Sequence, residues 1–229
     1  MPALLLIGRG RMGTLVEALA PEHGFDVAAA VDIETEGRHD TWPMADVAID
    51  FSVAEAVPAN IRTLASRGIN VVIGTTGWQA HEAELRGIAE ERGLGVVAAP
   101  NFAIGVNLFV ALAERAAQLW KDQPTFGAWI HELHHAAKRD APSGTALALE
   151  SAMRHEGYGH SIDVSSTRAG SIPGTHTIGF DAAAETITLT HTARDRTVFA
   201  RGALQAAKWV LGRRGWYSMR DVLGLVDGR

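Results

Sequence analysis

The chain has 229 residues, of which 47% are hydrophobic and 21% are charged. This is the composition of a globular protein, and it excludes an intrinsically disordered chain. The 26 acidic residues outnumber the 21 lysines and arginines, and the net charge of −5 argues against nucleic-acid binding through bulk charge. The chain has no cysteine, which excludes disulfides and thiolate metal sites and favours a reducing compartment. Its length suits one large domain or two small ones.

The N-terminus carries an apolar stretch, residues 3–7, that is too short for the core of a secretion signal. The sequence also lacks a run of about 18 uncharged apolar residues, which a transmembrane helix would need. We therefore expect a cytoplasmic protein with no membrane partner.

Short apolar runs alternate with amphipathic segments up to Pro100. Gly68 and Gly93 directly follow two of the amphipathic segments, a position where glycine commonly ends a helix. Strands that alternate with helices form βαβ units, in which helices cover both faces of a parallel sheet. The expected strands are residues 4–7, 27–31, 47–51, 71–73 and 96–98, and the expected helices are residues 13–20, 54–67 and 81–92.

After Pro100 the pattern changes. Polar and apolar residues alternate in three segments, as they do in strands with one exposed face. Such strands, with few helices between them, predict a second sheet that is mixed or antiparallel and has one face open to water or to another subunit. The alternating segments are residues 128–134, 162–168 and 186–193, and helices are expected over residues 106–121 and 199–211.

The first candidate site is a glycine-rich turn that follows the first strand and opens a helix. Its glycines permit a tight turn, close approach of the backbone to a pyrophosphate, and packing of the helix on the strand. The helix N-terminus offers N–H groups to the anion, and Asp32, at the end of the second strand, is placed to hold the ribose hydroxyls. The alternative is a structural turn without a ligand. The turn reads Gly8-Arg9-Gly10-Arg11-Met12-Gly13.

Two further loops follow strands of the same expected sheet. Ligands of open α/β sheets bind beyond the carboxyl ends of the strands, so both loops are expected to face the same crevice as the glycine-rich turn. The first loop is equally typical of an ordinary turn. The loops are Gly74-Thr75-Thr76-Gly77 and Ala99-Pro100-Asn101-Phe102.

The densest group of reactive side chains lies between residues 132 and 146. Ser143 is a typical helix N-cap, and the N–H groups of Gly144 and Thr145 at the start of that helix suit a carboxylate. Histidine titrates near neutral pH, and burial or neighbouring cations shift lysine towards it. The alternative is a polar surface loop. The candidates for proton transfer are His134, His135 and Lys138.

Residues 131–135 also read His-Glu-x-x-His, the pattern of zinc metalloproteases. That chemistry requires a helix, which brings positions i and i+4 onto one face. A metalloprotease gives no reason for the dinucleotide-binding features of the first half, so we expect no metal.

A glycine- and proline-rich stretch occupies residues 168–180. With Arg168 and His176 it is compatible with a second anion contact, and equally with an ordinary loop between strands.

Taken together, these motifs resemble those of the 4-hydroxy-tetrahydrodipicolinate reductases, also called dihydrodipicolinate reductases. The matching segments cover the chain nearly end to end, and the block with HHxxK and DAPSGTA is the most specific. They are GRGRMG, GTTG, APNFAIGVN, ELHHAAKRDAPSGTA, RAGSIPGTHTIGF and RTVFARGALQAAKWVLGRRGWYSMRDVLGL.

The resemblance implies an α/β fold with two domains. Residues 1–103 and 197–229 would form a Rossmann-like dinucleotide-binding domain. Residues 104–196 would form an α/β domain with a mixed sheet, which binds the substrate and builds a homotetramer.

The resemblance also implies a reaction, in lysine and diaminopimelate biosynthesis. NADH or NADPH reduces 4-hydroxy-tetrahydrodipicolinate, a cyclic imine dicarboxylate, to tetrahydrodipicolinate with loss of water. His134 would be the acid–base histidine and Lys138 the proton donor, and His135, Gly144 and Thr145 would contact the substrate. The implied cofactor contacts are the glycine-rich turn, Asp32, Gly74, Thr75, Thr76, Ala99, Pro100, Asn101 and Phe102.

The segment after the second strand departs from the family pattern. Family members often carry an arginine directly after the acidic residue, where it accepts the 2′-phosphate of NADPH, but here Ile33 and Glu34 follow Asp32. A carboxylate without an adjacent cation repels that phosphate, so we expect NADH to be preferred, with NADPH as the second cofactor. The preference would be softened by Arg9, Arg11 or Arg38.

Two alternatives stay open. The chain could reduce a different imine or an aldehyde, although the HHxxK block with its carboxylate-suited helix start argues against this. It could also sense a nucleotide without catalysis, but such a protein would have no need of His134 and Lys138.

Overall fold

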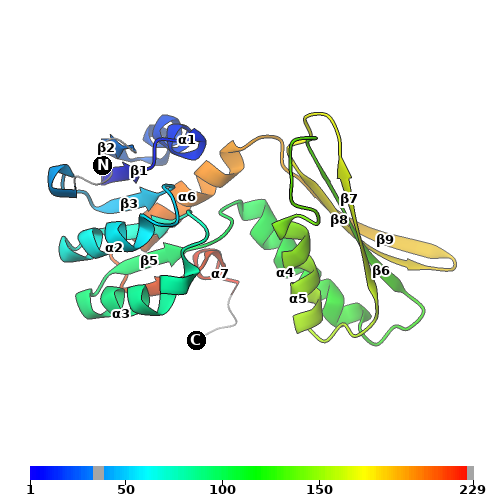
Figure 1. Ribbon diagram of the computed structural model, residues 1–229. Helices are drawn as coiled ribbons and strands as arrows, with labels where there is room; N and C mark the ends of the chain where they lie inside the picture. The colour runs from blue at the N-terminus through cyan, green and yellow to red at the C-terminus, as the bar shows by residue number, and fades with distance from the viewer. Residues whose placement is uncertain (33–38, 226–229) are drawn as a thin grey trace. The chain divides into compact units, whose positions relative to one another are not determined.

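The computed structural model describes residues 1–32 and 39–225 (Figure 1). The chain divides into two compact units, which we describe separately. Unit 1 consists of Met1–Ile104 and Thr197–Arg229, and unit 2 consists of Gly105–Arg196.

Unit 1 is built on a parallel six-stranded sheet with the strand order β10-β5-β4-β3-β1-β2. The strands are β1 (Ala3–Ile7), β2 (Asp26–Val31), β3 (Val47–Asp50), β4 (Asn70–Ile73), β5 (Gly95–Ala98) and β10 (Gly215–Tyr217). The helices are α1 (Arg11–Leu19), α2 (Val57–Ser66), α3 (Glu82–Arg92), α6 (Thr197–Val210) and α7 (Met219–Val222), with short 3-10 turns at Pro21–His23, His39–Thr41 and Gln79–His81. This arrangement confirms the expected Rossmann-like fold class.

The two faces of this sheet bury alternate residues of the same strands. On β1, Leu4 and Leu6 join the core cluster formed with α1, α6 and α7. Leu5 and Ile7 point the other way, into the cluster formed with α2 and α3. All four side chains are at most 2% exposed, which explains why β1 reads as an unbroken apolar run rather than an alternating one.

Some boundaries differ from those expected. Helix α1 begins at Arg11 rather than at residue 13, and α2 begins at Val57 rather than at residue 54 because residues 54–56 form a turn before Pro58. Helix α3 ends at Gly93, which adopts a left-handed φ of 63°. Strand β10 and helix α7 were not expected from the sequence.

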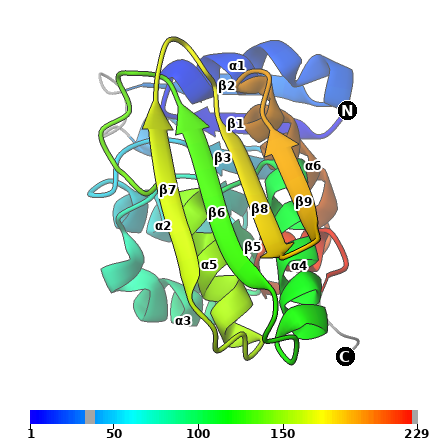
Figure 2. The same ribbon diagram turned by 90° about the vertical axis from the view of Figure 1, so that its right-hand side faces the viewer.

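Unit 2 contains a four-stranded mixed sheet with the strand order β7-β6-β8-β9. A mixed second sheet was expected, but strand β8 was not. Strands β6 and β7 are parallel, whereas β8 is antiparallel to both β6 and β9. The described helices of this unit, α4 and α5, lie on one face of the sheet (Figure 2). The bounds are α4 (Ile104–Trp120), β6 (Gly127–His134), α5 (Gly144–His155), β7 (Ile162–Arg168), β8 (Thr175–Ala182) and β9 (Glu185–Thr192).

The other face of this sheet is largely polar. Threonine hydroxyls pair across β8 and β9, with Oγ1–Oγ1 distances of 3.1 Å for Thr175–Thr192 and 3.0 Å for Thr177–Thr190. The ring of Trp129 lies over Gly179, where a Cβ atom would stand 2.2 Å from it.

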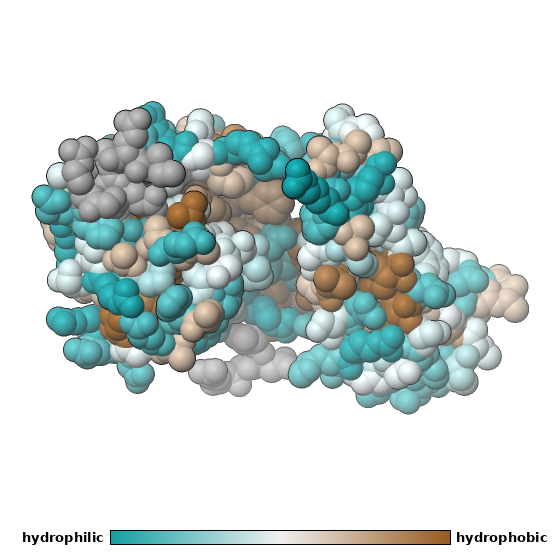
Figure 3. Space-filling view, viewed as in Figure 1, coloured by the Kyte–Doolittle hydropathy of each residue, from teal (hydrophilic) through white to brown (hydrophobic). Residues whose placement is uncertain are grey.

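Apolar patches also occur among hydrophilic residues on the surface drawn in Figure 3. Exposed large apolar side chains of unit 2 include Leu108, Leu112, Leu119 and Leu147.

The stretch over residues 168–180 is not one continuous bend. Arg168 is the last residue of β7, and Thr175 begins β8, so only residues 169–174 form the connection. His176 therefore lies in a strand and is buried rather than exposed on a loop.

Candidate active site

The glycine-rich turn connects β1 to α1, and each of its glycines meets a different demand. Gly8 has φ +90°, and a Cβ atom there would stand 2.4 Å from the carbonyl oxygen of Phe51. A Cβ atom on Gly13 would stand 2.0 Å from the carbonyl oxygen of Gly8, whereas nothing lies within 4 Å of one on Gly10. The fold thus requires Gly8 and Gly13, and Gly10 leaves open space where a ligand can approach the backbone.

Helix α1 begins directly after Gly10, so its first-turn N–H groups lack partners within the helix. Arg11 and Met12 occupy this first turn. Arg9 is exposed, and its Nε lies 3.4 Å from the Glu17 carboxylate. Unpaired N–H groups and the positive end of the helix dipole form an anion site beside the open space at Gly10.

Asp32 directly follows β2, the neighbour of β1 in the sheet. Its side chain is half-buried at the same carboxyl edge of the sheet as the glycine-rich turn. Ile33, Glu34 and Arg38, which enter the expectation about cofactor preference, lie outside the described residues.

Asp50, at the end of β3, organises the neighbouring loops, and the sequence analysis missed it. Its fully buried carboxylate accepts hydrogen bonds from the backbone N–H of Ser52 (2.9 Å), Asn60 Nδ2 (3.0 Å) and Thr75 Oγ1 (3.0 Å). A carboxylate that ends an otherwise apolar strand was the available signal. Through these bonds Asp50 fixes the loop after β4 against the loop after β3.

Phe51 completes this edge of the sheet. Its ring packs against Gly74, where a Cβ atom would stand 2.1 Å from it, and lies edge-on to Phe102 at 6.3 Å between centroids. Because the carbonyl oxygen of Phe51 also packs on Gly8, this residue brings the turn after β1 together with the loops after β4 and β5.

A cleft of about 510 Å³ opens at the carboxyl ends of β4, β5 and β10. Thr75, Ala99 and Pro100 from the two predicted loops line it, together with Trp78, whose indole Nε1 donates to the carbonyl oxygen of Thr75 at 2.7 Å. Of the other predicted loop residues, Thr76 is exposed beside it, and Asn101 Oδ1 accepts from the N–H of Ala103 at 2.9 Å.

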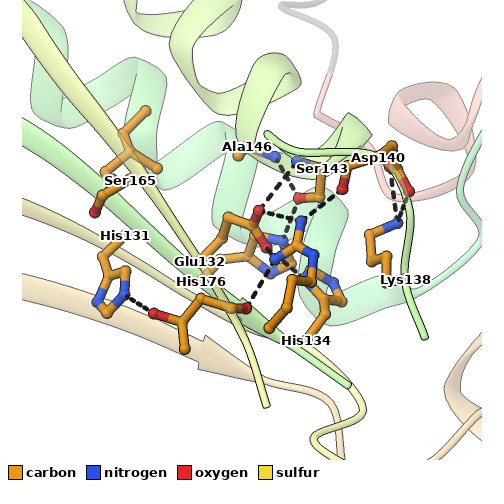
Figure 4. A network of polar contacts seen from close by, with 12 residues as sticks. His131, Glu132, His134, Lys138, Asp140, Ser143, Ala146, Ser165 and His176 are labelled. Carbon is orange, nitrogen blue, oxygen red and sulfur yellow. Dashed lines mark hydrogen bonds and ion pairs between the residues drawn. The ribbon is translucent and has the colours of Figure 1, made fainter. Parts of the chain in front are cut away.

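In unit 2, strand register assembles a second polar cluster (Figure 4). Glu132 and His134 are two residues apart on β6 and face the same side. Glu132 is paired with His176 on β8, and His134 is paired with Arg168 on β7. The cluster is therefore built from three strands whose residues are distant in the sequence.

Glu132 is the centre of this cluster and is fully buried. Its Oε1 accepts from Arg168 (2.6 Å) and from the backbone N–H of Ser143 (3.2 Å), while Oε2 accepts from Arg168 (3.0 Å) and contacts His134 Nδ1. Burial raises the pKa of this carboxyl, but hydrogen bonds from Arg168, Ser166 and His134 outweigh it and lower the pKa to about 2. The carboxylate is thus ionised at neutral pH.

His134 is buried, with only 9% of its surface exposed. Burial lowers its pKa below the ordinary value, and the hydrogen bond to Glu132 opposes this. Its ring stands edge-on to His176 at 5.1 Å, and a Cβ atom on Gly174 would be 3.0 Å from Nε2. Glycine at position 174 thus leaves room for the Nε2 edge of the ring.

Lys138 lies in the loop that follows β6. Its Nζ donates to both carboxylate oxygens of Asp140, at 2.7 and 2.8 Å, and this ammonium holds the pKa of Asp140 below its usual range. The carbonyl oxygen of Asp140 accepts from Arg168 at 2.6 Å, so the loop is tied to Glu132 through one guanidinium. His135, where the loop begins, is half-buried.

Helix α5 begins where the sequence predicts. Ser143 is its N-cap, and Oγ accepts from the N–H of Ala146 at 3.2 Å. Gly144 is exposed and has nothing within 4 Å of a Cβ atom, and Thr145 is half-buried. The first N–H groups of α5 therefore border open space, as an anion site requires.

The other interpretations of this segment fail on geometry. His131 and Glu132 lie on a strand, not on the helix that the metalloprotease pattern requires, and positions i and i+4 of a strand are about 13 Å apart. Arg168 is not available for the second anion contact that the sequence suggested, because its guanidinium is bound to Glu132 and to the carbonyl oxygen of Asp140.

A different trio, Glu132, His134 and His176, has ligand atoms within 4.8 Å of one another. Arg168 already neutralises both oxygens of the Glu132 carboxylate and would stand beside any bound cation. The donor set therefore favours a hydrogen-bond network over a metal centre. Within the described part of the chain, the helices are too short or too polar to cross a membrane.

Two family profiles match the chain. The profile described as "Dihydrodipicolinate reductase, N-terminus" covers residues 3–102, and "Dihydrodipicolinate reductase, C-terminus" covers residues 105–223.

Among similar curated proteins, the 4-hydroxy-tetrahydrodipicolinate reductase of Christiangramia forsetii is 34% identical over 231 residues, which cover 96% of this chain and 97% of the relative. The protein of the same name from Acidiphilium cryptum is 41% identical over 241 residues, which cover 94% of each. The solved structure of a dipicolinate-bound dihydrodipicolinate reductase from Paenisporosarcina sp. TG-14 has a TM-score of 0.80 at 23% identity, covering 95% of this chain and 97% of that one. This last similarity concerns the fold.

Proposed function

This chain belongs to the dihydrodipicolinate reductase family, and we propose that it reduces 4-hydroxy-tetrahydrodipicolinate to tetrahydrodipicolinate in lysine and diaminopimelate biosynthesis. One hydride from NADH or NADPH and one proton are consumed, and one water is released. The observation that carries the proposal is the linkage of His134 and the Lys138 loop to the start of α5 through Glu132 and Arg168.

The dinucleotide site is proposed in unit 1. The pyrophosphate would lie on Gly10 and the first turn of α1, where the open space and the unpaired N–H groups coincide. Asp32 would hold the ribose hydroxyls. The loops that contain Thr75 and Pro100 would contact the nicotinamide end, because they line the cleft at the same edge of the sheet. NADH is the proposed preferred cofactor, since the Asp32 carboxylate disfavours a 2′-phosphate.

The substrate site is proposed in unit 2. One substrate carboxylate would accept hydrogen bonds from the N–H groups of Gly144 and Thr145, where α5 begins. His135 and Lys138 add donors on the loop that precedes this helix. The relative from Paenisporosarcina sp. TG-14 binds dipicolinate, a cyclic dicarboxylate of the same chemical class, which supports this choice of ligand.

Hydride transfer is the chemistry that the cofactor supplies when bound. The chain's own residues bind and orient the imine substrate and transfer protons. His134 acts as the acid–base group through Nε2, since its Nδ1 is engaged by the Glu132 carboxylate. The Lys138 ammonium donates a proton, and its charge is compatible with the substrate's carboxylates once the pair with Asp140 opens.

We further propose a cytoplasmic homotetramer. The polar face of the unit 2 sheet, with its threonine pairs, is a candidate contact surface because both described helices of that unit cover the opposite face.

The test is a coupled assay. The substrate is generated in situ from pyruvate and aspartate semialdehyde by the synthase that condenses them, and NADH absorbance is followed. Substrate-dependent loss of NADH is the expected result. Retained NADH binding without turnover would contradict the proposal and would favour another imine substrate or a nucleotide-sensing protein.

A further inference from the structure

We propose that Glu132 is a positioning residue that sets the tautomer of His134 and ties it to the start of helix α5. The proposal rests on the proposed function, in which His134 transfers a proton and α5 binds a substrate carboxylate. It assigns a role to a fully buried carboxylate that is not among the proposed ligand contacts.

The first step concerns the proton on His134. An ionised carboxylate only accepts hydrogen bonds, so the ring nitrogen that contacts Glu132, Nδ1, carries the hydrogen. In a neutral imidazole Nε2 then has a free lone pair, and it takes up or releases the reacting proton. Without the carboxylate, either tautomer would be available.

The second step concerns the different partners of the two Glu132 carboxylate oxygens. Oε2 contacts His134, whereas Oε1 accepts from the backbone N–H of Ser143, the N-cap of α5, at 3.2 Å. One rigid group thus fixes the distance between the acid–base nitrogen and the N–H groups of the helix start. Arg168 bridges both oxygens and also holds the carbonyl oxygen of Asp140, which extends the same support to the Lys138 loop.

The third step concerns charge. His134 is faced by Glu132 from β6, Arg168 from β7, His176 from β8 and Lys138 from the following loop. Glu132 is the negative group among these four, so it alone favours the protonated imidazole. Loss of its charge leaves His134 among cationic or neutral neighbours, and protonation then requires a lower pH.

The test compares Glu132→Gln with Glu90→Gln, which makes the same substitution at an exposed position of α3. The glutamine amide can present N–H to Nδ1, which then must accept, and the imidazole hydrogen moves to Nε2. We expect kcat to fall at least about tenfold in Glu132→Gln, with KM for NADH unchanged and the His134 inflection of the pH–rate profile moved to lower pH. Glu90→Gln should leave all three unchanged.

The tautomer is read directly from the imidazole ¹⁵N shifts of His134, assigned by comparison with His134→Asn. The wild-type protein should show hydrogen on Nδ1 and Glu132→Gln should show it on Nε2, both without substrate. A Glu132→Gln protein that loses only thermal stability, with tautomer and pH profile unchanged, would overturn the proposal. Hydrogen on Nε2 in the wild type would do the same, even if the variant fails to fold.

This measurement separates the two proposals. Absence of turnover by the wild-type protein in the coupled assay contradicts the proposed function. The ¹⁵N shifts of the unliganded proteins still decide whether Glu132 sets the tautomer of His134.

Discussion

Glu132 and His134 bond to each other because they stand two residues apart on β6, on the same face of the strand. The spacing places an acceptor beside the imidazole without any contribution from tertiary structure. The tertiary structure adds Arg168 and Ser143, which hold the carboxylate in place. The proposed acid–base histidine and its proposed positioning residue thus come from one strand, and residues outside this strand hold the carboxylate in place.

The glycine-rich turn allows a paired prediction. Gly10→Ala should retain the fold, with a free energy of unfolding within about 0.5 kcal/mol of the wild type, because nothing lies within 4 Å of the new Cβ atom. It should nevertheless weaken NADH binding, since the methyl group occupies the space proposed for the pyrophosphate. Chemical denaturation and NADH titration by fluorescence check the two parts.

Gly13→Ala is the matched comparison. Its Cβ atom would stand 2.0 Å from the carbonyl oxygen of Gly8, so we expect a loss of about 1 to 3 kcal/mol in unfolding free energy. Equal stability of the two alanine variants, or unchanged NADH affinity in Gly10→Ala, would contradict the assignment of distinct roles to these glycines.

Lys138→Ala tests the proton donor. We expect kcat to fall by about a hundredfold or more, because the proton donor is lost. NADH affinity and thermal stability should stay close to those of the wild type, because Lys138 pairs with Asp140, whose side chain is largely exposed to solvent. Arg139→Ala, at the exposed neighbouring position, is the control and should retain turnover. Near-normal kcat in Lys138→Ala would remove this residue from its proposed role.

Asp32→Ala tests cofactor choice. Removing a carboxylate that accepts hydrogen bonds from the ribose hydroxyls should raise KM for NADH by about tenfold or more. It should also narrow the discrimination against NADPH, because the repulsion of a 2′-phosphate disappears. The ratio of kcat/KM values for the two cofactors is the measurement. An unchanged ratio would place the ribose contact elsewhere, and a wild-type preference for NADPH would contradict the proposed preference.

The burial of His176 leads us to expect that unit 2 becomes less stable at acidic pH. Burial and His134 lower its folded-state pKa to about 4 from an ordinary value of 6.5, so the unfolded chain binds the proton first as the pH falls. Stability should therefore decrease between pH 6.5 and pH 4, by up to about 3 kcal/mol. Thermal unfolding of His176→Gln should show a weaker pH dependence in this window than the wild type. His155→Gln, on the exposed side of α5, should behave as the wild type does.

Local patterns were sufficient for most of the fold. Strand β1 and the N-cap Ser143 are encoded by neighbouring residues, and the α/β class with a mixed second sheet was predicted correctly. Strand β10 was missed because three half-buried residues carry little periodicity, and it forms only because β5 offers a free edge. Strand β8 was not predicted, because the preceding Pro173 and Gly174 are typical of turns and the whole stretch was interpreted as a bend.

The candidate site divides in the same way. His134 and Lys138 were identifiable as reactive groups in a short segment, and their roles remain predictions. The sequence indicated Glu132 only as part of a metalloprotease pattern. Its role in the polar cluster was not predictable, because its partners depend on the register of strand pairing. Arg168 is brought to it by pairing between β6 and β7, and His176 by pairing between β6 and β8. A single sequence does not specify such long-range register.

Unit 1 is assembled from both ends of the chain, and this has a consequence for the order of synthesis. Residues 105–196 leave the ribosome before α6 and β10 have been synthesised, so unit 2 can complete its sheet first. At that stage unit 1 still lacks α6, which packs on Phe102, and β10, which pairs with β5. Until then one core face of the first sheet lacks α6 and α7 and is only partly covered, by α1, and the β5 edge is unpaired. The nucleotide-binding half, although begun first, is therefore the last part of the nascent chain to reach its native state.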